Sequence, residues 1–278
     1  MQPSFPKSTH VLIAVVGERK EAREKATCLR WPSFIRVRIS TILAKMRNLE
    51  ERIQTLAQWV FEANYPVVFT GAGISTESGL PDFRGPDGIW TRQEKGLPPP
   101  PRLFSEVEPN ASHEAIVELQ KLGKLRFLIS QNVDNLHLQS GIPPDLLAEL
   151  HGNTTKLRCI RCKVQVDKSL GLKTCSCGGP LVSTVVNFGD SLPAKELRDS
   201  FDHASRCDLF IVVGSSLVVS PANEMPRAAL RSGARLVIIN KGETPLDGSC
   251  HLRFDEKIGQ VLPPAVERLK KLMRKGKR

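Results

Sequence analysis

The sequence predicts an α/β fold in which helices cover both faces of a parallel β-sheet. Four short, continuously apolar runs have the length of buried strands: Pro66–Thr70, Arg126–Ser130, Leu209–Gly214 and Leu236–Asn240. Helical patterns intervene at residues 112–122, 194–205 and 222–231. Apolar strands that alternate with helices are typical of parallel sheets buried on both faces. Polar or glycine residues follow each run, so we expect a ligand site at the carboxyl ends of the strands.

The first helix of this fold is predicted to begin at Asn48. Asn48 and Glu51 have the spacing of a capping box, and the apolar residues that follow lie on one helical face. Gly85–Asn110, about 26 residues with a proline run at Pro98–Pro101, has little periodicity and is predicted to be a long loop. Loops of this length within a domain are usually functional or disordered.

The formal charge of +11 is concentrated near the two ends of the chain. Residues 1–45 carry a net +6 and residues 268–278 a net +7, whereas residues 46–267 carry −2. Basic ends commonly contact nucleic acid or another acidic surface, and solubilising ends without a partner are the alternative. We interpret residues 266–278 as a basic tail. For residues 1–45 three interpretations stay open: a disordered extension, a targeting segment, or an untranslated stretch before a start at Met46.

Four of the seven cysteines lie within residues 156–182 as two close pairs: Cys159 and Cys162, then Cys175 and Cys177. Two thiolate pairs are typical of a tetrahedral zinc site, although the usual zinc ribbon has two residues between the cysteines of both pairs. A redox dithiol or a disulfide pair is the alternative, which the lack of a recognisable secretion signal disfavours. We predict one structural zinc ion, closed to catalysis because the protein supplies all four ligands.

A glycine turn, Gly71-Ala72-Gly73, directly follows the first predicted strand. Small residues in such a turn let backbone N–H groups approach a phosphate. By itself the turn is weak evidence, because it lacks the third glycine of the dinucleotide fingerprint and such turns are common in strand–helix connections. No Walker lysine follows, which disfavours ATP.

The blocks around that turn are much more specific. Residues 71–90 read GAGISTESGLPDFRGPDGIW, followed in order by QNVDNLH (131–137), HG (151–152), FGD (188–190), GSS (214–216) and Asn240. In this order, around four cysteines, they resemble the sirtuin family of NAD-dependent protein-lysine deacylases over about residues 48–268. Within that family the chain looks most like class IV, which contains nuclear chromatin-directed sirtuins, through GIWT at 88–91 and DSLP at 190–193.

The resemblance implies a Rossmann-like catalytic domain at residues 46–265, with a small zinc-binding domain inserted. The Rossmann-like parts are about 46–85, 125–155 and 183–265. The small domain comprises about 86–124 and the zinc module 156–182. In the implied reaction, the acyl-lysine oxygen attacks C1′ of the nicotinamide ribose, and the products are free lysine, nicotinamide and O-acyl-ADP-ribose.

By similarity, the catalytic residues are His151, as general base, and Asn132 beside C1′. Imidazole suits this role because it titrates near neutrality. A surface or packing role is the alternative for any histidine, and we favour it for His10, His113, His203 and His251. His137 is interpreted as structural, either an orienting group or a core polar group.

The resemblance also assigns contacts to NAD. Those near nicotinamide and its ribose are Asp82, Phe83, Gln131, Asn132 and Asp134. Those of the cofactor loop, the phosphates and the second ribose are Gly71, Ala72, Gly73, Thr76, Arg84, Trp90, Gly214, Ser215, Ser216, Asn240 and, through its backbone, Ile258. From the residues alone, the QNVD block can equally be a cap of the preceding strand.

Val186, Phe188 and Gly189 match the family's acyl-lysine tunnel, where a peptide would add as a strand through main-chain bonds. Two residues depart from the family pattern. Leu80 replaces the usual Ile, a volume-conserving change, and Asp190 replaces the usual Glu, which can alter the substrate strand.

We therefore predict an enzyme, an NAD-dependent protein-lysine deacylase, with NAD+ as co-substrate and one zinc ion. A protein mono-ADP-ribosyltransferase using the same NAD site is the alternative. A zinc-knuckle nucleic-acid binder is disfavoured, because it leaves the Gly71–Arg84 block unexplained and the knuckle lacks stacking aromatics. The expected partners are acyl-lysine proteins, such as histone-like or chromatin proteins, with weak nucleic-acid contact through the basic ends and no membrane. We expect a cytoplasmic or nuclear (nucleoid) location, with organelle targeting by residues 1–45 open.

Overall fold

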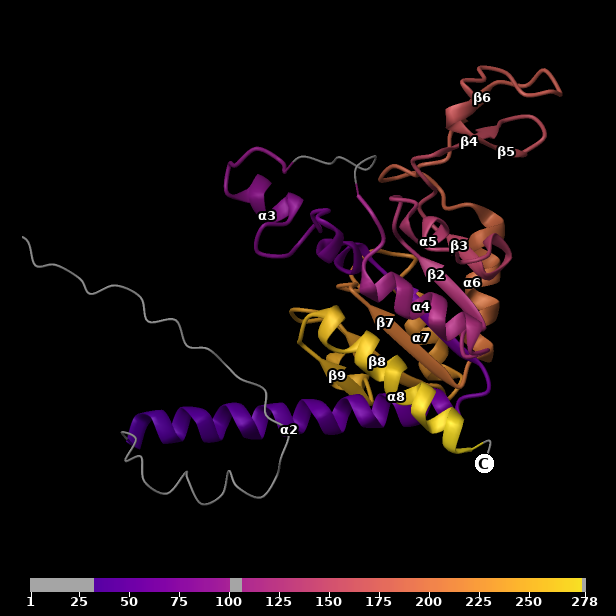
Figure 1. Cartoon of the computed structure of the whole chain (residues 1–278). Helices are drawn as coiled ribbons and strands as arrows, with labels where there is room; N and C mark the ends of the chain where they lie inside the picture. The colour runs from indigo at the N-terminus through magenta and orange to yellow at the C-terminus, as the bar shows by residue number, and fades with distance from the viewer. Residues whose placement is uncertain (1–32, 101–106, 277–278) are drawn as a thin grey trace, which may run out of the picture. The chain divides into compact units, whose positions relative to one another are not determined.

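The computed structural model describes residues 33–100 and 107–276. Its centre is a six-stranded, entirely parallel sheet of order β3-β2-β1-β7-β8-β9 (Figure 1). The strands are β1 (Pro66–Thr70), β2 (Phe127–Ser130), β3 (Leu147–Glu149), β7 (Leu209–Val213), β8 (Arg235–Ile239) and β9 (Leu252–Phe254). The four predicted strands and the predicted fold class are confirmed.

The order of the strands creates a switch point between β1 and β7. From β1 the chain continues outward to β2 and β3, then returns to the other side of β1 and builds β7, β8 and β9. Thr70, Ser130 and Val213 are register partners, so the carboxyl ends of three central strands lie level with one another. Open α/β sheets bind their ligands at such a point.

Each face of the sheet has its own layer of helices, because successive strand residues point to opposite faces. Val68 and Ile211 pack with α2 (Ser33–Glu62), α4 (Ala111–Lys121) and α8 (Leu262–Lys275). The alternate residues, Phe69 and Phe210 among them, pack with α6 (Ala194–Arg206) and α7 (Glu224–Arg231). Both faces are therefore buried, which explains why the strand sequences are apolar without interruption.

A separate small sheet of order β5-β4-β6, with antiparallel pairing, carries Cys159 at the end of β4 and the other three cysteines in the loops between its strands. Its strands are β4 (Lys156–Cys159), β5 (Gln165–Asp167) and β6 (Leu181–Ser183). The remaining short elements are η1 (Ala72–Ser78), α3 (Ile89–Glu94), α5 (Leu136–Gln139), η3 (Pro144–Leu146), η4 (Lys168–Leu170), η5 (Asp247–Ser249) and η6 (Ile258–Gln260).

The structure adds helical residues in three places where the sequence patterns gave none. Helix α2 begins at Ser33 instead of Asn48, in a stretch without glycine or proline that continues the helix toward the N-terminus. The predicted tail from residue 266 is largely helix α8, whose buried Val266 and Leu269 are hidden in sequence among lysines and arginines. The long loop at 85–110 contains α3. Among the described residues, no helix has the length and apolarity needed to cross a bilayer.

Candidate active site and metal centre

A cleft of about 950 Å³ opens at the carboxyl edge of the parallel sheet. Segments that follow four neighbouring strands line it: Gly71–Gly73 after β1, Gln131–Asp134 after β2, Gly214–Pro221 after β7 and Asn240–Glu243 after β8. The loop at Val185–Leu192, which follows β6, lines it as well. The cleft is large enough for a dinucleotide and a substrate side chain together.

The turns after β1 and β7 touch through their backbones at the switch point. Gly73 N donates to Gly214 O over 2.9 Å. A Cβ on Gly71 would lie 2.7 Å from Gly214 O, and one on Gly214, whose φ is +66°, would lie 2.4 Å from Ile74 N. Since real Cβ atoms do not approach backbone so closely, glycine is required on both sides of this contact.

Three buried polar side chains form a closed network on the β2 side of the cleft. Ser75 Oγ donates to Asp134 Oδ2 over 2.6 Å, and Asn132 Nδ2 donates to Ser75 Oγ over 3.1 Å. Asp134 Oδ1 accepts from the N–H of Leu136 at 3.0 Å. The amide orientation of Asn132 is thereby fixed, and its buried Oδ1 has no hydrogen-bond partner. This acceptor fits a ligand donor such as a ribose hydroxyl, because a buried polar atom left unpaired is costly.

His151 lines the same cleft, just beyond the end of β3. Its Nδ1 lies 2.9 Å from Gln131 O. A carbonyl can only accept, so Nδ1 carries the proton and Nε2 keeps a free lone pair. Burial lowers the pKa of His151 below 6.5, and the bond to the Gln131 carbonyl partly opposes that shift. A neutral imidazole with an available Nε2 is the form that a general base requires.

Aromatic side chains and one arginine form the outer wall. The Trp90 ring lies 5.1 Å from the Phe83 ring and 5.7 Å from the Phe188 ring, centroid to centroid. The Arg84 guanidinium stacks 4.1 Å over Trp90 and donates to Ser216 Oγ at 3.2 Å. Burial lowers the pKa of Arg84 from its usual value, and at 78% exposure Phe188 presents an apolar surface at the mouth. This wall can shield a ligand from water and hold an anionic group.

The four cysteines make a separate, metal-sized cluster. Their Sγ atoms all lie within 4.8 Å of one another, with 3.5 Å between Cys159 and Cys177 and 3.6 Å between Cys162 and Cys175. A tetrahedral zinc ion with Zn–S bonds of about 2.3 Å needs sulfurs about 3.8 Å apart, so the donor set fits structural zinc. Gly179 packs against it, since a Cβ there would lie 2.6 Å from Cys159 Sγ.

Comparison with known proteins identifies the family to which this chain belongs. The sequence matches the model of the Sir2 family over residues 71–106 and 100–221. It is 38% identical over 251 residues to NAD-dependent protein deacylase 2 of Archaeoglobus fulgidus, covering 81% of this chain and 98% of that protein. The chain belongs to the Sir2 family.

Other Sir2 relatives agree with this assignment. The chain is 43% identical to NAD-dependent protein deacetylase SRT1 of Oryza sativa subsp. indica, over 77% of its own length and 47% of the relative's. It thus spans about half the length of that plant protein. A Sir2 structure with a p53 peptide and NAD+ matches with a TM-score of 0.60 and 34% identity, covering 79% of this chain and 96% of that one. Sir2Af2 bound to a myristoylated histone peptide matches with a TM-score of 0.62 and 35% identity, covering 81% and 99%.

In this Sir2 chain, most of the site residues predicted from sequence gather at the cleft. Those that line it are Gly71, Ala72, Gly73, Asp82, Phe83, Arg84, Trp90, Gln131, Asn132, Asp134, His151, Val186, Phe188, Gly189, Gly214, Ser215, Ser216 and Asn240. Two do not. Thr76 is exposed and donates to Gly73 O, and Ile258 is buried in the core with α8.

Sequence reasoning missed Ser75, although it stands within the quoted block between the glycine turn and Thr76. Its role is visible only in space, where it joins Asn132 to Asp134. His113, predicted to have a surface or packing role, and His137, predicted to be structural, are both buried, with ring centroids 5.1 Å apart.

Proposed function

We propose that this chain is an NAD-dependent protein-lysine deacylase that produces free lysine, nicotinamide and O-acyl-ADP-ribose. The observation that carries the proposal is the pairing, in one cleft, of a neutral His151 with the unpartnered Oδ1 of Asn132. One supplies a base and the other an acceptor for a ribose hydroxyl. The relatives with deacylase or deacetylase names support the same assignment.

Bound NAD would supply an electrophilic ribose carbon, C1′, and a leaving group, nicotinamide. The acyl-lysine oxygen would replace nicotinamide at C1′, and the chain's own residues would bind and orient both substrates. The glycine turns at Gly73 and Gly214, with Arg84 beside them, suit the diphosphate, while Phe83 and Trp90 keep water from the reacting carbon. Asn132 would hold the ribose through its unpartnered Oδ1 and, as an uncharged amide, would add no negative charge beside C1′.

His151 then takes a proton from a ribose hydroxyl onto Nε2. Its Nδ1–H stays on the Gln131 carbonyl, which keeps the ring oriented and stabilises the imidazolium that forms. The Gln131 side chain is itself held, since Nε2 donates to Ser215 Oγ at 2.8 Å. The base is therefore positioned by the segments after β2 and β7.

An acyl-lysine peptide panel, run on the full chain with and without NAD, tests this function. The panel spans acetyl to myristoyl groups, because the related structures include both a p53 peptide and a myristoylated histone peptide. We expect NAD-dependent loss of the acyl group and O-acyl-ADP-ribose by mass spectrometry. ADP-ribosylated protein without deacylation would instead establish the transferase alternative.

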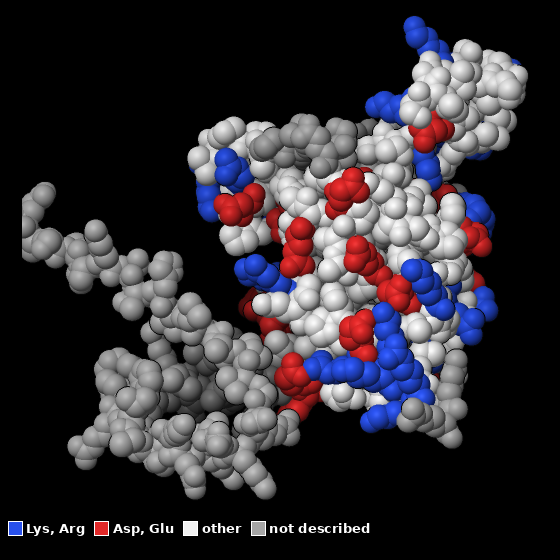
Figure 2. Space-filling model, in the orientation of Figure 1, with Lys and Arg blue, Asp and Glu red and all other residues white. Residues whose placement is uncertain are grey.

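We further propose chromatin proteins as substrates, with weak nucleic-acid contact through helix α8. The C-terminal part of α8 carries exposed Lys271, Arg274 and Lys275, and Figure 2 shows basic side chains gathered there. Exposed cations on one helix are suited to phosphate backbones. We expect deacylation of DNA-bound histone-like protein to weaken with salt more steeply than that of a free peptide, and Lys271→Glu/Arg274→Glu to remove the difference. Such substrates imply a cytoplasmic, nucleoid or nuclear location, which fractionation of cells would check.

A further inference from the structure

The loop that follows β8 forms the far side of the cleft from His151. We name residues 240–244 the Asn240 loop. Its members Asn240, Lys241 and Gly242 line the cleft, and Gly242 has a φ of +89°. The Asn240 amide is used inside the loop, because Nδ2 donates to Lys241 O at 3.2 Å and to Gly242 O at 3.1 Å. Lys241, Gly242 and Glu243 are exposed, so contacts from outside the loop are needed to fix its shape.

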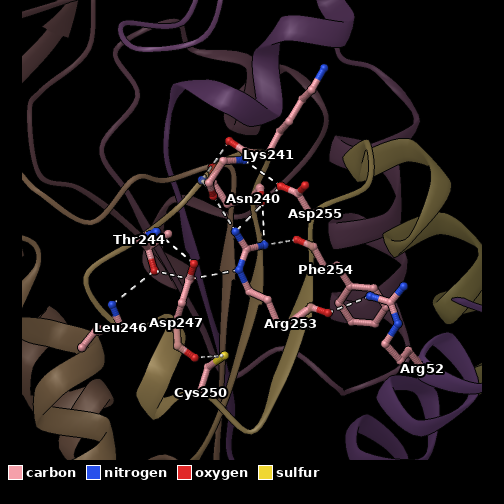
Figure 3. A network of polar contacts seen from close by, with 11 residues as sticks. Arg52, Asn240, Lys241, Thr244, Leu246, Asp247, Cys250, Arg253, Phe254 and Asp255 are labelled. Atoms are coloured by element: carbon pink, nitrogen blue, oxygen red, sulfur yellow. Dashed lines mark hydrogen bonds and ion pairs between the residues drawn. The ribbon is translucent and has the colours of Figure 1, made fainter. Parts of the chain in front are cut away.

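Arg253 on β9 makes several of these outside contacts, and Asp255 Oδ1 makes another by accepting from Gly242 N at 2.8 Å (Figure 3). Nη1 donates to Asn240 O over 2.6 Å and also to Phe254 O. Nη2 donates to Gly242 O over 2.5 Å. The side chain is 23% exposed and does not itself line the cleft. One guanidinium thus ties two carbonyls of the Asn240 loop to the edge strand of the sheet.

Asp247 completes the frame around the loop. Its Oδ1 accepts from Arg253 Nε at 2.9 Å and from Thr244 Oγ1 at 2.6 Å. Its Oδ2 accepts from Thr244 N at 3.2 Å. The Arg253–Asp247 pair therefore holds the beginning and the end of the Asn240 loop at once.

The backbone beneath Arg253 is anchored in turn. Arg52 of helix α2 donates from Nη1 to Arg253 O over 2.8 Å, and its Nη2 pairs with Glu256 Oε1 at 2.6 Å. Arg253 therefore projects from a strand edge that is tied to the helix layer. The guanidinium has a firm base from which to position the loop.

We propose that Arg253 is a positioning residue for the β8 side of the cofactor cleft: it holds the Asn240 loop in the shape that receives the adenosine half of NAD, without touching the cofactor. The assignment of NAD to this cleft rests on the proposed function. Arginine suits the task, because its planar fork can serve several acceptors at fixed angles. A lysine at this position could reach one or two of these acceptors, and a methionine none.

Loss of the fork leaves the loop to be ordered by the ligand itself, which raises the free-energy cost of binding. The proposed catalytic groups, Asn132 and His151, lie across the sheet and keep their own bonds. Removal of Arg253 should therefore weaken cofactor binding and spare turnover at saturation.

The test uses the full chain with Arg253→Lys and Arg253→Met. The matched control is Arg235→Met, because Arg235 begins the neighbouring strand β8 and pairs at the surface with Glu62 over 3.0 Å. Two readouts are taken: the Kd of ADP-ribose by calorimetry, and KM for NAD with kcat on an acyl-lysine peptide. We expect the Kd and KM of Arg253→Met to rise about tenfold or more, with kcat within about threefold of wild type. The Kd and KM of Arg253→Lys should lie between those of wild type and those of Arg253→Met, and the values of Arg235→Met should match wild type.

Two results would overturn the proposal. One is wild-type ADP-ribose affinity in Arg253→Lys and Arg253→Met. The other is a fall in kcat with KM and Kd unchanged, which indicates a general structural role. Because ADP-ribose binding needs no catalysis, this arm still decides the role of Arg253 if wild-type protein shows no deacylation. A wild-type chain that binds ADP-ribose without deacylating peptides would therefore count against the proposed function and leave Arg253 to be judged by its Kd.

Discussion

The two sides of the cleft hold their ligand-facing groups by different means. On the β2–β3 side, Ser75, Asn132 and Asp134 are buried side chains bonded to one another, and His151 is held by a carbonyl. On the β8–β9 side, a turn of backbone is held from behind by Arg253 and Asp247. Burial makes the first side rigid and sets its protonation states, whereas the second depends on a few charged hydrogen bonds near solvent. Changes on the first side should therefore affect turnover, and changes on the second should affect cofactor affinity.

The largest expected effect is that of His151→Ala, which removes the base from the β2–β3 side. Deacylation should fall by roughly 10²- to 10⁴-fold, while ADP-ribose affinity stays near wild type. Initial rates with an acyl-lysine peptide and calorimetry measure the two quantities. His251→Ala, at an exposed histidine outside the cleft lining, is the control and should keep its activity. Wild-type turnover in a folded His151→Ala protein would show that another group is the base.

Loss of the structural zinc ion should also affect the β2–β3 side of the cleft. The chain that leaves the small sheet packs on the His151 segment, where Val186 N donates to His151 O at 2.9 Å. Cys175→Ser should lose about one zinc ion per chain and, locally, on the order of several kcal/mol of stability. Turnover should then fall while ADP-ribose still binds. Metal analysis and hydrogen exchange measure this, with Cys250→Ser as a control that keeps its zinc. A well-folded wild type without zinc would contradict the assignment.

Acid should weaken the β2–β3 side through two buried histidines. Burial lowers the pKa of His113 to about 4 and that of His137 to about 3, with the nearby Asp134 charge opposing the shift of His113 and His113 adding to that of His137. The unfolded chain takes up these protons near pH 6.5 and the folded chain does not, so stability is lost as pH falls below 6.5. The two groups together should lower the free energy of unfolding by roughly 4 kcal/mol between pH 6.5 and 4.5.

Urea unfolding at several pH values measures this loss. His113→Asn should make the pH dependence about half as steep, and His251→Ala should leave it unchanged. Equal stability at pH 6.5 and 4.5 would mean that neither histidine stays neutral in the folded chain.

The smallest effect should come from Ser75→Ala, which opens the buried network without removing a proposed catalytic group. Asp134 loses a charged hydrogen bond of 2.6 Å, and the Asn132 amide loses one of its two bonds, keeping the one to Asp134 Oδ2 at 3.2 Å. The kcat/KM should fall by about tenfold to a hundredfold, from a loss of about 1.5–3 kcal/mol. Thr76→Ala, at the next residue, lies outside the cleft and should be neutral. A larger loss in Thr76→Ala than in Ser75→Ala would reverse this interpretation of the turn.

The sheet was predictable because each central strand is buried on both faces and is therefore continuously apolar. Strands β3 and β9, with three residues each, are too short to leave such a pattern. Helix α8 was not predicted, because its buried residues are interspersed with the lysines and arginines that dominate the composition there. Composition describes the exposed face of such a helix and conceals the face that packs.

Cleft residues that face the ligand were predictable, because they lie within the sequence motifs that resemble the sirtuin family. It was not predictable for Ser75 or Arg253, which act on other protein groups. Arg253 stands nine residues after the end of the loop that it holds, next to Phe254 in an ordinary-looking edge strand. Only the pairing of β8 with β9 brings its guanidinium against Asn240 and Gly242.

The contact between Gly73 and Gly214 makes the floor of the cleft its least compressible part. The turns after β1 and β7 are in backbone contact there, with no room for a side chain between them. Even one added methyl group would therefore push the two turns apart. The floor cannot widen or narrow to suit a substrate. Accommodation of acyl groups of different size must therefore come from the rim, where Phe188 stands largely in solvent and touches Trp90 on one side.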